Sequence, residues 1–548
     1  MTAVSQQAKD SDAGPSVNEP VEGGLPSEDN AAQAASGGVS EAQRRQRPMW
    51  ATAVPTWFAA MAAQLLLIFV GGPVGLADNG DSTRTLCSVG FYMEQPADGS
   101  QRLNDWVISN AYQVDENTCG NDLPTSWWHR IFGLADTLTG ASETSPLRIG
   151  AVGLINMMLV STAMASIGAA FDTSRRWSLA LAAGLCMFIL DIAFLAYARS
   201  WYTEPAGFVS MLFGVAAILM LTRPAGGAVP WGGVAASVVA TLGLTLAKLQ
   251  GVILALPLVV LTCIVVWPYL RKAAGVVALV VVLGTYIASA WVIWSDQPEW
   301  MQNINRYHSV LVGVAVHAPY STQALSDLGM DPGLARYTGK GWWDPEAGRN
   351  DPAFWAGYDR TSLSNVAKYY VTHPETGLRA IGSGVSASFE MRPDYLGNYA
   401  ANTSHEAREH ACRWCGFSTV TNWLRPISGV VVVAFHVLAL VGLVLAGRAR
   451  RAGRGLVVWF QLSVVAAVAI LWYDLAVIPA VLGDGTYELI KHTVFGSYAL
   501  GVCAWSLIGQ AVVYFVRRSP ASNNTKSFPG RTRATGPGRQ RRSRSRGF

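Results

Sequence analysis

The residues best suited to do chemistry follow the first long apolar run of the chain. That run ends near Val70, and residues 75–81 (Gly-Leu-Ala-Asp-Asn-Gly-Asp) come soon after it, with Arg84 close behind. Ionisable side chains beside a membrane span are costly, so they are candidates for function by default. Asp78, Asp81 and Arg84 therefore suit a substrate that is anchored in the bilayer, because its headgroup stays near the membrane surface.

A second charged stretch surrounds the third apolar run. Asp191 lies inside that run and is followed by Arg199, Tyr202 and Glu204. Pro205 suits the first turn of a helix, where the helix dipole would favour the carboxylate of Glu204. A capping acid among interfacial aromatic residues is the structural alternative for this stretch.

Two short segments add further charges. Lys248 follows one apolar run, and Asp484, Glu488, Lys491 and His492 precede the last one. Glu488 stands three residues before Lys491 and four before His492, so the three share a helical face. These cations could bind a phosphate. Lys248 could instead snorkel to the interface, and Glu488 and Lys491 could form a simple ion pair.

Four segments that are distant in sequence thus carry acids and bases at one predicted membrane face, which a shared pocket would explain. The acids could deprotonate an acceptor hydroxyl or hold a divalent ion. The cations could hold a phosphate leaving group and stabilise its charge. The sequence has no GxxxxGK[ST] loop, GxSxG elbow or HExxH motif, which argues against an ATP-driven pump.

The composition is that of a membrane protein. Of the 548 residues, 51% are hydrophobic and only 14% are charged, against about 25% charged residues in soluble domains. About 20 apolar residues suffice to cross the hydrocarbon core. The pattern predicts an all-α polytopic membrane protein with about ten transmembrane helices, at residues 53–72, 147–170, 177–198, 205–222, 231–247, 251–269, 273–294, 427–446, 455–476 and 494–516.

Basic residues indicate the orientation, because short cytoplasmic loops are enriched in Lys and Arg. With ten spans, every Arg or Lys cluster between the runs falls on the same side as the two termini. We therefore expect a plasma-membrane protein with both termini in the cytoplasm. Two large loops, 72–146 and 295–426, then lie outside. The first apolar run is longer than a signal-peptide core and is followed by nine more, so we expect it to stay as an anchor.

The same patterns divide the chain into parts. We expect disordered cytoplasmic tails at 1–49 and 517–548, a transmembrane catalytic module at 50–294 that includes outer loop 72–146, an extracytoplasmic loop domain at 295–426, and C-terminal transmembrane helices at 427–516. The C-terminal tail is basic, and such segments beside a membrane helix are attracted to anionic lipid. We expect the lipid bilayer as its partner and no nucleic acid.

Four cysteines lie in the two predicted outer loops. An outer compartment is oxidising, so we expect a Cys87–Cys119 disulfide and a second one within Cys412-x-x-Cys415. His405 and His410 precede the second pair, which leaves a zinc site as an alternative. Pairings between the two loops are a further alternative.

These residues resemble a known family. Residues 75–81 with Arg84 resemble the signature of bacterial multi-spanning hexose transferases of glycan biosynthesis, which are similar to the GT-C class of integral-membrane glycosyltransferases. Asp191 with residues 202–206, then 395–399 and 483–492, resemble later marks of that family. The resemblance covers most of residues 50–516. It departs at Ser82, where an aromatic residue is expected.

The resemblance implies transfer of a hexose from a polyprenyl-phosphate donor to a cell-envelope glycan on the extracytoplasmic face, commonly with inversion. It implies a catalytic carboxylate at Asp78, with Asp81 and Glu204 as its partners. It implies that the substrate-binding residues are Arg84, Asp191, Arg199, Lys248, Asp484, Lys491 and His492. No cofactor is implied with certainty. A divalent metal stays open, because metal dependence varies within the GT-C class.

Two other functions are compatible with such a chain. A transporter or flippase of lipid-linked sugars would place charges at the bilayer midplane, often at broken helices in repeated halves. Here the charges gather at one face and no internal repeat occurs. A ligase or polymerase of lipid-linked glycans would use the same face but would move whole oligosaccharides.

Overall fold

The computed structural model describes residues 48–93, 99, 101–113, 128–140, 145–224, 228–453 and 457–518. Within them the chain is mostly helical, and every run that was predicted to span the membrane forms helix, so the all-α polytopic fold class is confirmed. Eight helical segments are long and apolar enough to cross a bilayer; they contain α2 (Trp50–Phe69), α5 (Ile149–Ala170), α8 (Glu204–Leu221), α10 (Leu249–Val266), α11 (Ala273–Ser295), α19 (Ser428–Arg451), α20 (Val457–Asp484) and α22 (Val494–Arg518).

Two predicted spans take a different form. The third run is split into α6 (Arg175–Ile189) and α7 (Ile192–Ala198), which are bent by 85°. The fifth run forms α9 (Trp231–Thr245), whose 15 residues rise about 22 Å, less than a hydrocarbon core of about 30 Å. The described residues therefore give eight spans, or nine if the bent pair counts as one, against the ten predicted.

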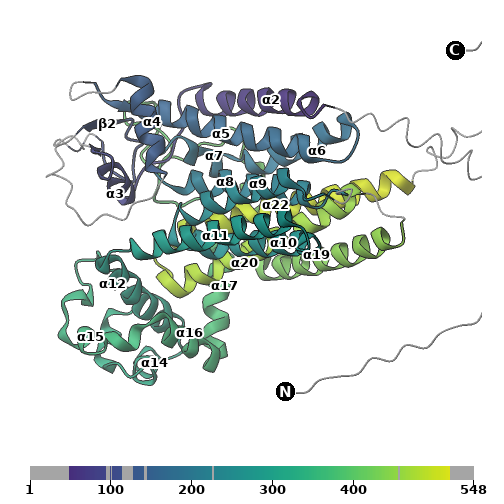
Figure 1. The fold of residues 1–548 in the computed structure, drawn as a ribbon. Helices are drawn as coiled ribbons and strands as arrows, with labels where there is room; N and C mark the ends of the chain where they lie inside the picture. The colour runs from purple at the N-terminus through teal and green to yellow at the C-terminus, as the bar shows by residue number, and fades with distance from the viewer. Residues whose placement is uncertain are drawn as a thin grey trace, which may run out of the picture. The chain divides into compact units, whose positions relative to one another are not determined.

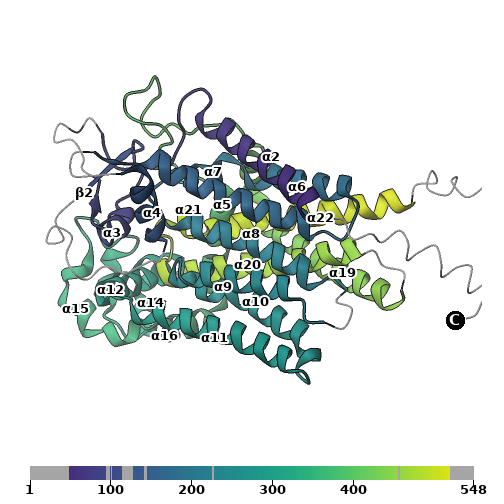
Figure 2. The same cartoon turned by 45° about the horizontal axis from the view of Figure 1, so that its top comes forward.

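The helices pack around α8 and α20. α8 is enclosed on nearly all sides, since 89% of its residues are buried. α2 packs on α5, α5 and α9 pack on α8, and α20 lies against both α22 and α19 (Figures 1 and 2). α8 and α20 also contact each other, so the ends of these two helices can carry side chains into one site.

The first predicted outer loop contains a small sheet that the sequence patterns did not predict. α3 (Asp81–Cys87) and α4 (His129–Thr139) accompany the antiparallel strands β1 (Phe91–Tyr92), β2 (Asn110–Gln113) and β3 (Leu147–Arg148), in the order β1-β2-β3. Phe91 pairs with Gln113, and Ala111 pairs with Leu147. Buried apolar residues of this region form their own cluster, which includes Leu86 of α3, the helix that begins directly after residues 75–80.

The second predicted outer loop is a layer of short helices. They are α12 (Glu299–Tyr307), the π-helix η3 (His308–Val314), α13 (Ala315–His317), α14 (Ser321–Asp327), η4 (Pro332–Tyr337), η5 (Gly348–Asn350), α15 (Pro352–Ala356), η6 (Tyr358–Thr361), α16 (Leu363–Thr372), α17 (Pro374–Glu390) and α18 (Gly416–Leu424). Tyr307, Leu311 and Phe354 form a separate core together with Val481 of α20. This core fastens the layer to the end of α20.

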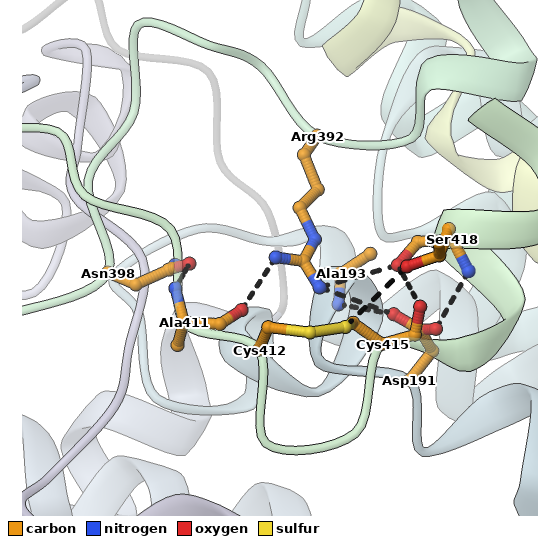
Figure 3. Close-up of a disulfide and its surroundings, with 9 residues drawn as sticks. Asp191, Ala193, Arg392, Asn398, Ala411, Cys412, Cys415 and Ser418 are labelled. Atoms are coloured by element: carbon orange, nitrogen blue, oxygen red, sulfur yellow. Dashed lines mark hydrogen bonds and ion pairs between the residues drawn. A yellow bond between two sulfur atoms is a disulfide. The ribbon is translucent and has the colours of Figure 1, made fainter. Parts of the chain in front are cut away.

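The cysteines follow the disulfide prediction where the structure describes them. Cys412 and Cys415 are bonded to each other (Figure 3), so their sulfurs are not zinc ligands. Cys87 is disulfide-bonded as well, and its predicted partner Cys119 lies outside the described residues.

Candidate active site

The segment that carries Asp78 is held by backbone hydrogen bonds to distant parts of the chain. The N–H of Gly75 donates to the carbonyl of Asn398 (3.0 Å), and the N–H of Ala77 donates to that of Gly397 (2.8 Å). The Asn398 amide returns a bond to the carbonyl of Gly75 (2.6 Å). A Cβ on Gly75 would lie 2.5 Å from the carbonyl oxygen of Arg199, so this close approach requires glycine. Two of the family-like marks thus pack directly on each other.

Asp78 is buried, with 3% of its surface exposed. Its Oδ1 accepts from the N–H groups of Gly80 (2.6 Å) and Ser82 (3.3 Å), and its Oδ2 accepts from the Ser82 hydroxyl. Burial raises the pKa of Asp78 to about 6, although Ser82 and Lys491 act in the opposite direction. Because a carboxylate oxygen has two lone pairs, Oδ2 can still accept one more hydrogen bond. The residue can therefore exchange a proton with a substrate near neutral pH.

Asn79 joins three segments of the chain. Its backbone N–H donates to the Tyr202 hydroxyl (2.9 Å), and its Oδ1 accepts from that hydroxyl (3.1 Å) and from Lys491 Nζ (3.1 Å). Its Nδ2 donates to the carboxylate of Glu488 (2.7 Å). Glu488 has a φ of +46°, a left-handed conformation that is uncommon for residues other than glycine and that is often found at functional sites.

Lys491 is the central cation of the site. Its side chain is fully buried; it forms an ion pair with Asp81 and lies 3.6 Å from Glu488 Oε2. The ammonium also sits 4.8 Å from the centre of the Tyr202 ring, a cation–π contact. Burial disfavours the charged form, but Asp81, Glu488 and Glu204 together raise the pKa of Lys491. It therefore stays protonated at neutral pH.

A second ion pair connects α8 with α10. Glu204 begins α8, with Pro205 in the first turn as predicted, and is 2% exposed. Lys248, the residue before α10, places its Nζ 2.7 Å from Glu204 Oε1. The side chain of Lys248 is 30% exposed, so it stays accessible to a ligand.

Asp484, the last residue of α20, lies between two histidines. His308 Nδ1 is 3.4 Å from one carboxylate oxygen, and His492 Nε2 is 3.4 Å from the other. The backbone N–H of Trp342 donates to His308 Nε2 (2.9 Å), so the proton of a neutral His308 is on Nδ1, facing Asp484. Burial lowers the pKa of His492. The layer of short helices therefore contributes the imidazole of His308 to the site.

The contact between Asp484 and His308 depends on the glycine that follows. Gly485 has a φ of +60°, and a Cβ there would lie 2.4 Å from the backbone N of Gly313 in the π-helix. π-helical turns often occur at functional sites. We expect Gly485→Ala to lower the free energy of unfolding by about 1–3 kcal/mol. The backbone at residue 485 would be strained, and the added methyl group would push it away from Gly313.

Gly483→Ala is the matched control for this substitution. Gly483 lies two residues away within α20, and a Cβ there would meet nothing within 4 Å. Thermal unfolding of both variants in detergent micelles measures the difference. Equal stability of the two variants would show that the close approach of Gly485 to Gly313 does not require glycine at position 485.

The structure brings most of the predicted site residues together. The described side chains that interact electrostatically in this region are those of Asp78, Asp81, Glu204, Lys248, Asp484, Lys491 and His492; they form three separate ion pairs, Asp81–Lys491, Glu204–Lys248 and Asp484–His492, and the charge of Lys491 also acts on Asp78 and Glu204. Arg84 lies in α3, but its side chain is outside the described part of the structure. Arg199 is 6% exposed and donates to Ser109 Oγ (3.4 Å), while its Nε and Nη1 have no hydrogen-bond partner within the described ranges. Burial lowers the pKa of Arg199 to about 10, which leaves it charged.

Asp191 has a different environment from the one that we predicted. It is fully buried and accepts from the N–H of Ala193 (3.0 Å) and from the N–H of Ser418 (2.8 Å), as Figure 3 shows. Arg392 Nη2 lies 3.7 Å from its Oδ1. These bonds cap α7 and attach the start of α18 beside the Cys412–Cys415 disulfide. These contacts are structural, and substrate binding by Asp191 stays a prediction.

Several members of the site were not predicted as such: Asn79, Ser82, Tyr202, Glu488 and His308. Asn79 and Ser82 are neighbours of predicted carboxylates, and Glu488 stands three residues before Lys491. The sequence could therefore have indicated all three as members of the site. The sequence predicts His308 only as one of four polar residues of its loop that could contact a sugar, with Arg306, Arg392 and Asn398. Its pairing with Asp484, 176 residues away, was not predicted. Within the described ranges no three His, Cys, Asp or Glu side chains converge on a metal position.

Comparison with known proteins places this chain in a family. The profile described as the YfdI N-terminal transmembrane domain matches residues 47–530. No curated protein matches the chain. Among solved structures, the chain is similar to the oligosaccharyltransferase AglB from Archaeoglobus fulgidus, in complex with an inhibitory peptide and a dolichol-phosphate (10% identity, 85% of this chain, 50% of that one, TM-score 0.34). It is also similar to ArnT from Cupriavidus metallidurans bound to undecaprenyl phosphate (18% identity, 85% of this chain, 77% of that one, TM-score 0.26). The chain thus spans about half the length of the archaeal enzyme.

Proposed function

We propose that this chain, which belongs to the family of the YfdI N-terminal transmembrane domain, is an integral-membrane glycosyltransferase. It moves a hexose from a polyprenyl-phosphate donor to a cell-envelope glycan. The observation that carries the proposal is the environment of Asp78, a buried carboxyl group whose pKa is raised to about 6 and whose charge interacts with that of Lys491. Glycosyl transfer needs a base for the acceptor hydroxyl and a cation for the departing phosphate, and these two residues offer both.

The reaction follows from the free hydrogen-bonding position on Asp78. An acceptor hydroxyl bonds to Oδ2, and the ionised carboxylate takes its proton as the hydroxyl oxygen attacks the anomeric carbon. A bond forms between the acceptor oxygen and that carbon, and the bond from the carbon to the phosphate oxygen breaks. The polyprenyl phosphate leaves with the electron pair. Attack on the side opposite to the leaving group inverts the anomeric configuration.

The other charged residues support these two events. Asp81 and Glu204 hold Lys491 and Lys248 in place, and both lysines can stabilise the phosphate that develops negative charge. The buried and partly unpaired guanidinium of Arg199 is a further candidate for the phosphate. Asp484 and His492 complete the polar wall on the side of α20. Arg84 stays a predicted donor contact.

We further propose that the reaction takes place on the extracytoplasmic face of the plasma membrane, with both termini in the cytoplasm. The last turn of α19 carries Arg448, Arg450 and Arg451, and α20 runs away from that end towards Asp484. The site therefore lies at the end of the bundle opposite to this basic cluster, as the positive-inside rule requires. Trp343 of the outer layer is 61% exposed. A membrane-impermeant thiol reagent should label Trp343→Cys in intact cells, and absence of labelling would contradict this orientation.

The direct test of the function uses the purified protein in nanodiscs. A panel of synthetic polyprenyl-phosphohexoses is supplied with glycan from the source strain, and the mass gained by the glycan is measured. Transfer from one donor identifies the hexose. If the protein instead speeds the movement of donor lipid across vesicle membranes and adds no sugar, the flippase function is correct. Transfer of whole lipid-linked oligosaccharides would indicate a ligase or polymerase.

The pH dependence of the reaction should follow Asp78. A general base acts in its ionised form, so kcat/KM should rise with pH, with a midpoint at about 6, and level off near pH 7. Ser82→Ala removes a hydrogen bond that lowers the pKa of Asp78, so the rising limb should move to higher pH. Initial rates between about pH 5 and 8 measure both curves. A flat profile for the parent protein would exclude Asp78 as the base.

A further inference from the structure

A cavity of about 560 Å³ lies beside the ion-pair network and is not used by the mechanism above. Its polar lining consists of His317, Arg379, Ser383, Ser386, Glu390 and Arg425, and Leu489 and Ile490 of α21 (Leu489–His492) form part of its wall. The volume lies within the range of roughly 300–1,000 Å³ that is usual for sites of small ligands. We call it the α17 cavity.

One face of α17 provides most of this lining. Arg379, Ser383, Ser386 and Glu390 recur at intervals of three or four residues, so they share one side of the helix. A different side packs on α20, where a Cβ on Gly384 would lie 2.6 Å from the side chain of Val481. The polar side is therefore not required for the packing of α17 on the transmembrane bundle.

The charges in the lining are already paired. Arg425 Nη1 lies 2.5 Å from Glu390 Oε2, and its Nε donates to Ser386 Oγ (3.1 Å). Arg379 Nη2 lies 2.6 Å from Glu375 Oε1. Each guanidinium thus already has a carboxylate partner, Glu390 within the lining and Glu375 beside it, so neither arginine is left to bind a phosphate alone.

The remaining lining groups form a neutral hydrogen-bonding pair. His317 Nδ1 lies 2.8 Å from the carbonyl oxygen of Gly313, which places the imidazole proton on that nitrogen. Its Nε2, 2.9 Å from Ser383 Oγ, is then an acceptor. Burial lowers the pKa of His317, so the ring is neutral at pH 7. Paired ions, hydroxyls and a neutral imidazole supply donors and acceptors side by side, and the hydroxyl groups of a sugar need both.

We propose that the α17 cavity binds a saccharide unit of the acceptor glycan, close to the unit that receives the hexose. This inference rests on the proposed function. α21 separates the cavity from Asp78 and its neighbours: Leu489 and Ile490 contribute to the cavity, whereas Lys491 pairs with Asp81. Four helical residues rise only about 6 Å, so the cavity and the ion pair of Lys491 are about one helical turn apart.

Gly382 allows a test that fills the cavity without disturbing the fold. It lines the cavity within α17, and a Cβ there would meet nothing within 4 Å. We expect Gly382→Trp to raise the KM for the acceptor glycan at least tenfold. The KM for the polyprenyl-phosphohexose and kcat should stay within twofold of the parent values. Full-length protein in nanodiscs and oligosaccharides released from the envelope of the source strain serve as enzyme and acceptor.

A control variant accompanies this test. Gly429→Trp adds the same side chain at another helical glycine with nothing within 4 Å, outside the cavity, and should not change the acceptor KM. An unchanged acceptor KM in Gly382→Trp would overturn the inference, and so would a rise confined to the donor KM.

Direct binding separates this inference from the function itself. If the parent protein transfers no sugar, titration calorimetry with the same oligosaccharides still tests the cavity. Binding to the parent that is lost in Gly382→Trp and kept in Gly429→Trp would support the cavity while the transferase function fails. Absence of binding to the parent would overturn both. Binding that Gly382→Trp leaves intact would overturn the cavity alone.

Discussion

Asp78→Asn should abolish sugar transfer while the protein stays folded. The substitution keeps the size of the side chain but removes its ability to take a proton from the acceptor hydroxyl. Positioned general bases contribute roughly 10²–10⁴-fold to a rate, so we expect kcat to fall by about 10³-fold with little change in the KM of the donor. Single-turnover transfer from a labelled donor lipid measures the loss.

The same substitution should not destabilise the protein at neutral pH. The pKa of Asp78 is raised by burial from an ordinary 3.8 to about 6, so the folded state binds this proton more tightly than the unfolded state does. For a carboxyl group with a raised pKa, this contribution to stability is complete below about pH 4 and is lost as the pH rises through about 6. The neutral amide does not suffer that loss. We expect the Tm of Asp78→Asn at pH 7.5 to equal or exceed that of the parent.

Asp191→Asn is the matched control, because both aspartates are buried and only Asp78 is proposed as the base. Asp191 accepts bonds that cap α7 and hold Ser418, and Arg392 stands beside it. Its amide should therefore lower Tm and leave kcat per folded molecule nearly unchanged. If Asp78→Asn transfers at the parent rate, or if Asp191→Asn loses transfer without losing stability, the roles of the two residues have been exchanged.

The sequence patterns identified the helices well because apolar runs of membrane length have few alternatives to helix. They failed at positions where a distant segment decides the local structure. Residues 177–198 read as one span, but the chain bends by 85° between α6 and α7. At that bend Asp191 caps α7 and accepts from Ser418, 227 residues away. No local pattern contains that partner.

The candidate site was predictable in part for a similar reason. Asp78, Asp81, Glu204, Lys248 and Lys491 stand out because charges at the ends of apolar runs are rare and costly. Their mutual pairing was not predictable, since Glu204 pairs with Lys248 and Asp81 with Lys491 only once distant segments have been brought together by the fold. The small sheet of the first outer loop also escaped prediction, because two of its strands have only two residues each. Strands this short leave no alternation to read.

Lys491→Met should be the most destabilising substitution in the site. The ammonium is fully buried, and Asp81, Glu488 and Glu204 are the charges that keep it protonated. Removing one partner of a buried ion pair leaves the other uncompensated and typically costs about 3–5 kcal/mol. Part of the negative charge can reach water, because the side chain of Asp81 is 35% exposed, so we expect a loss near the lower end of that range. Urea unfolding in mixed micelles measures it.

A second substitution decides whether charge is the cause of that loss. If the uncompensated carboxylate of Asp81 destabilises Lys491→Met, then adding Asp81→Asn should restore stability, with a coupling of about 0.5–3 kcal/mol. Lys248→Met is the control, because it also removes a cation from an ion pair. It should lower the free energy of unfolding by less than Lys491→Met does, because the side chain of Lys248 is 30% exposed. The stabilised double variant should still lack transfer, since it has no ammonium beside Asp78 to meet the phosphate. Recovery of transfer together with stability would instead mean that Lys491 only balances charge, and that the donor phosphate binds elsewhere.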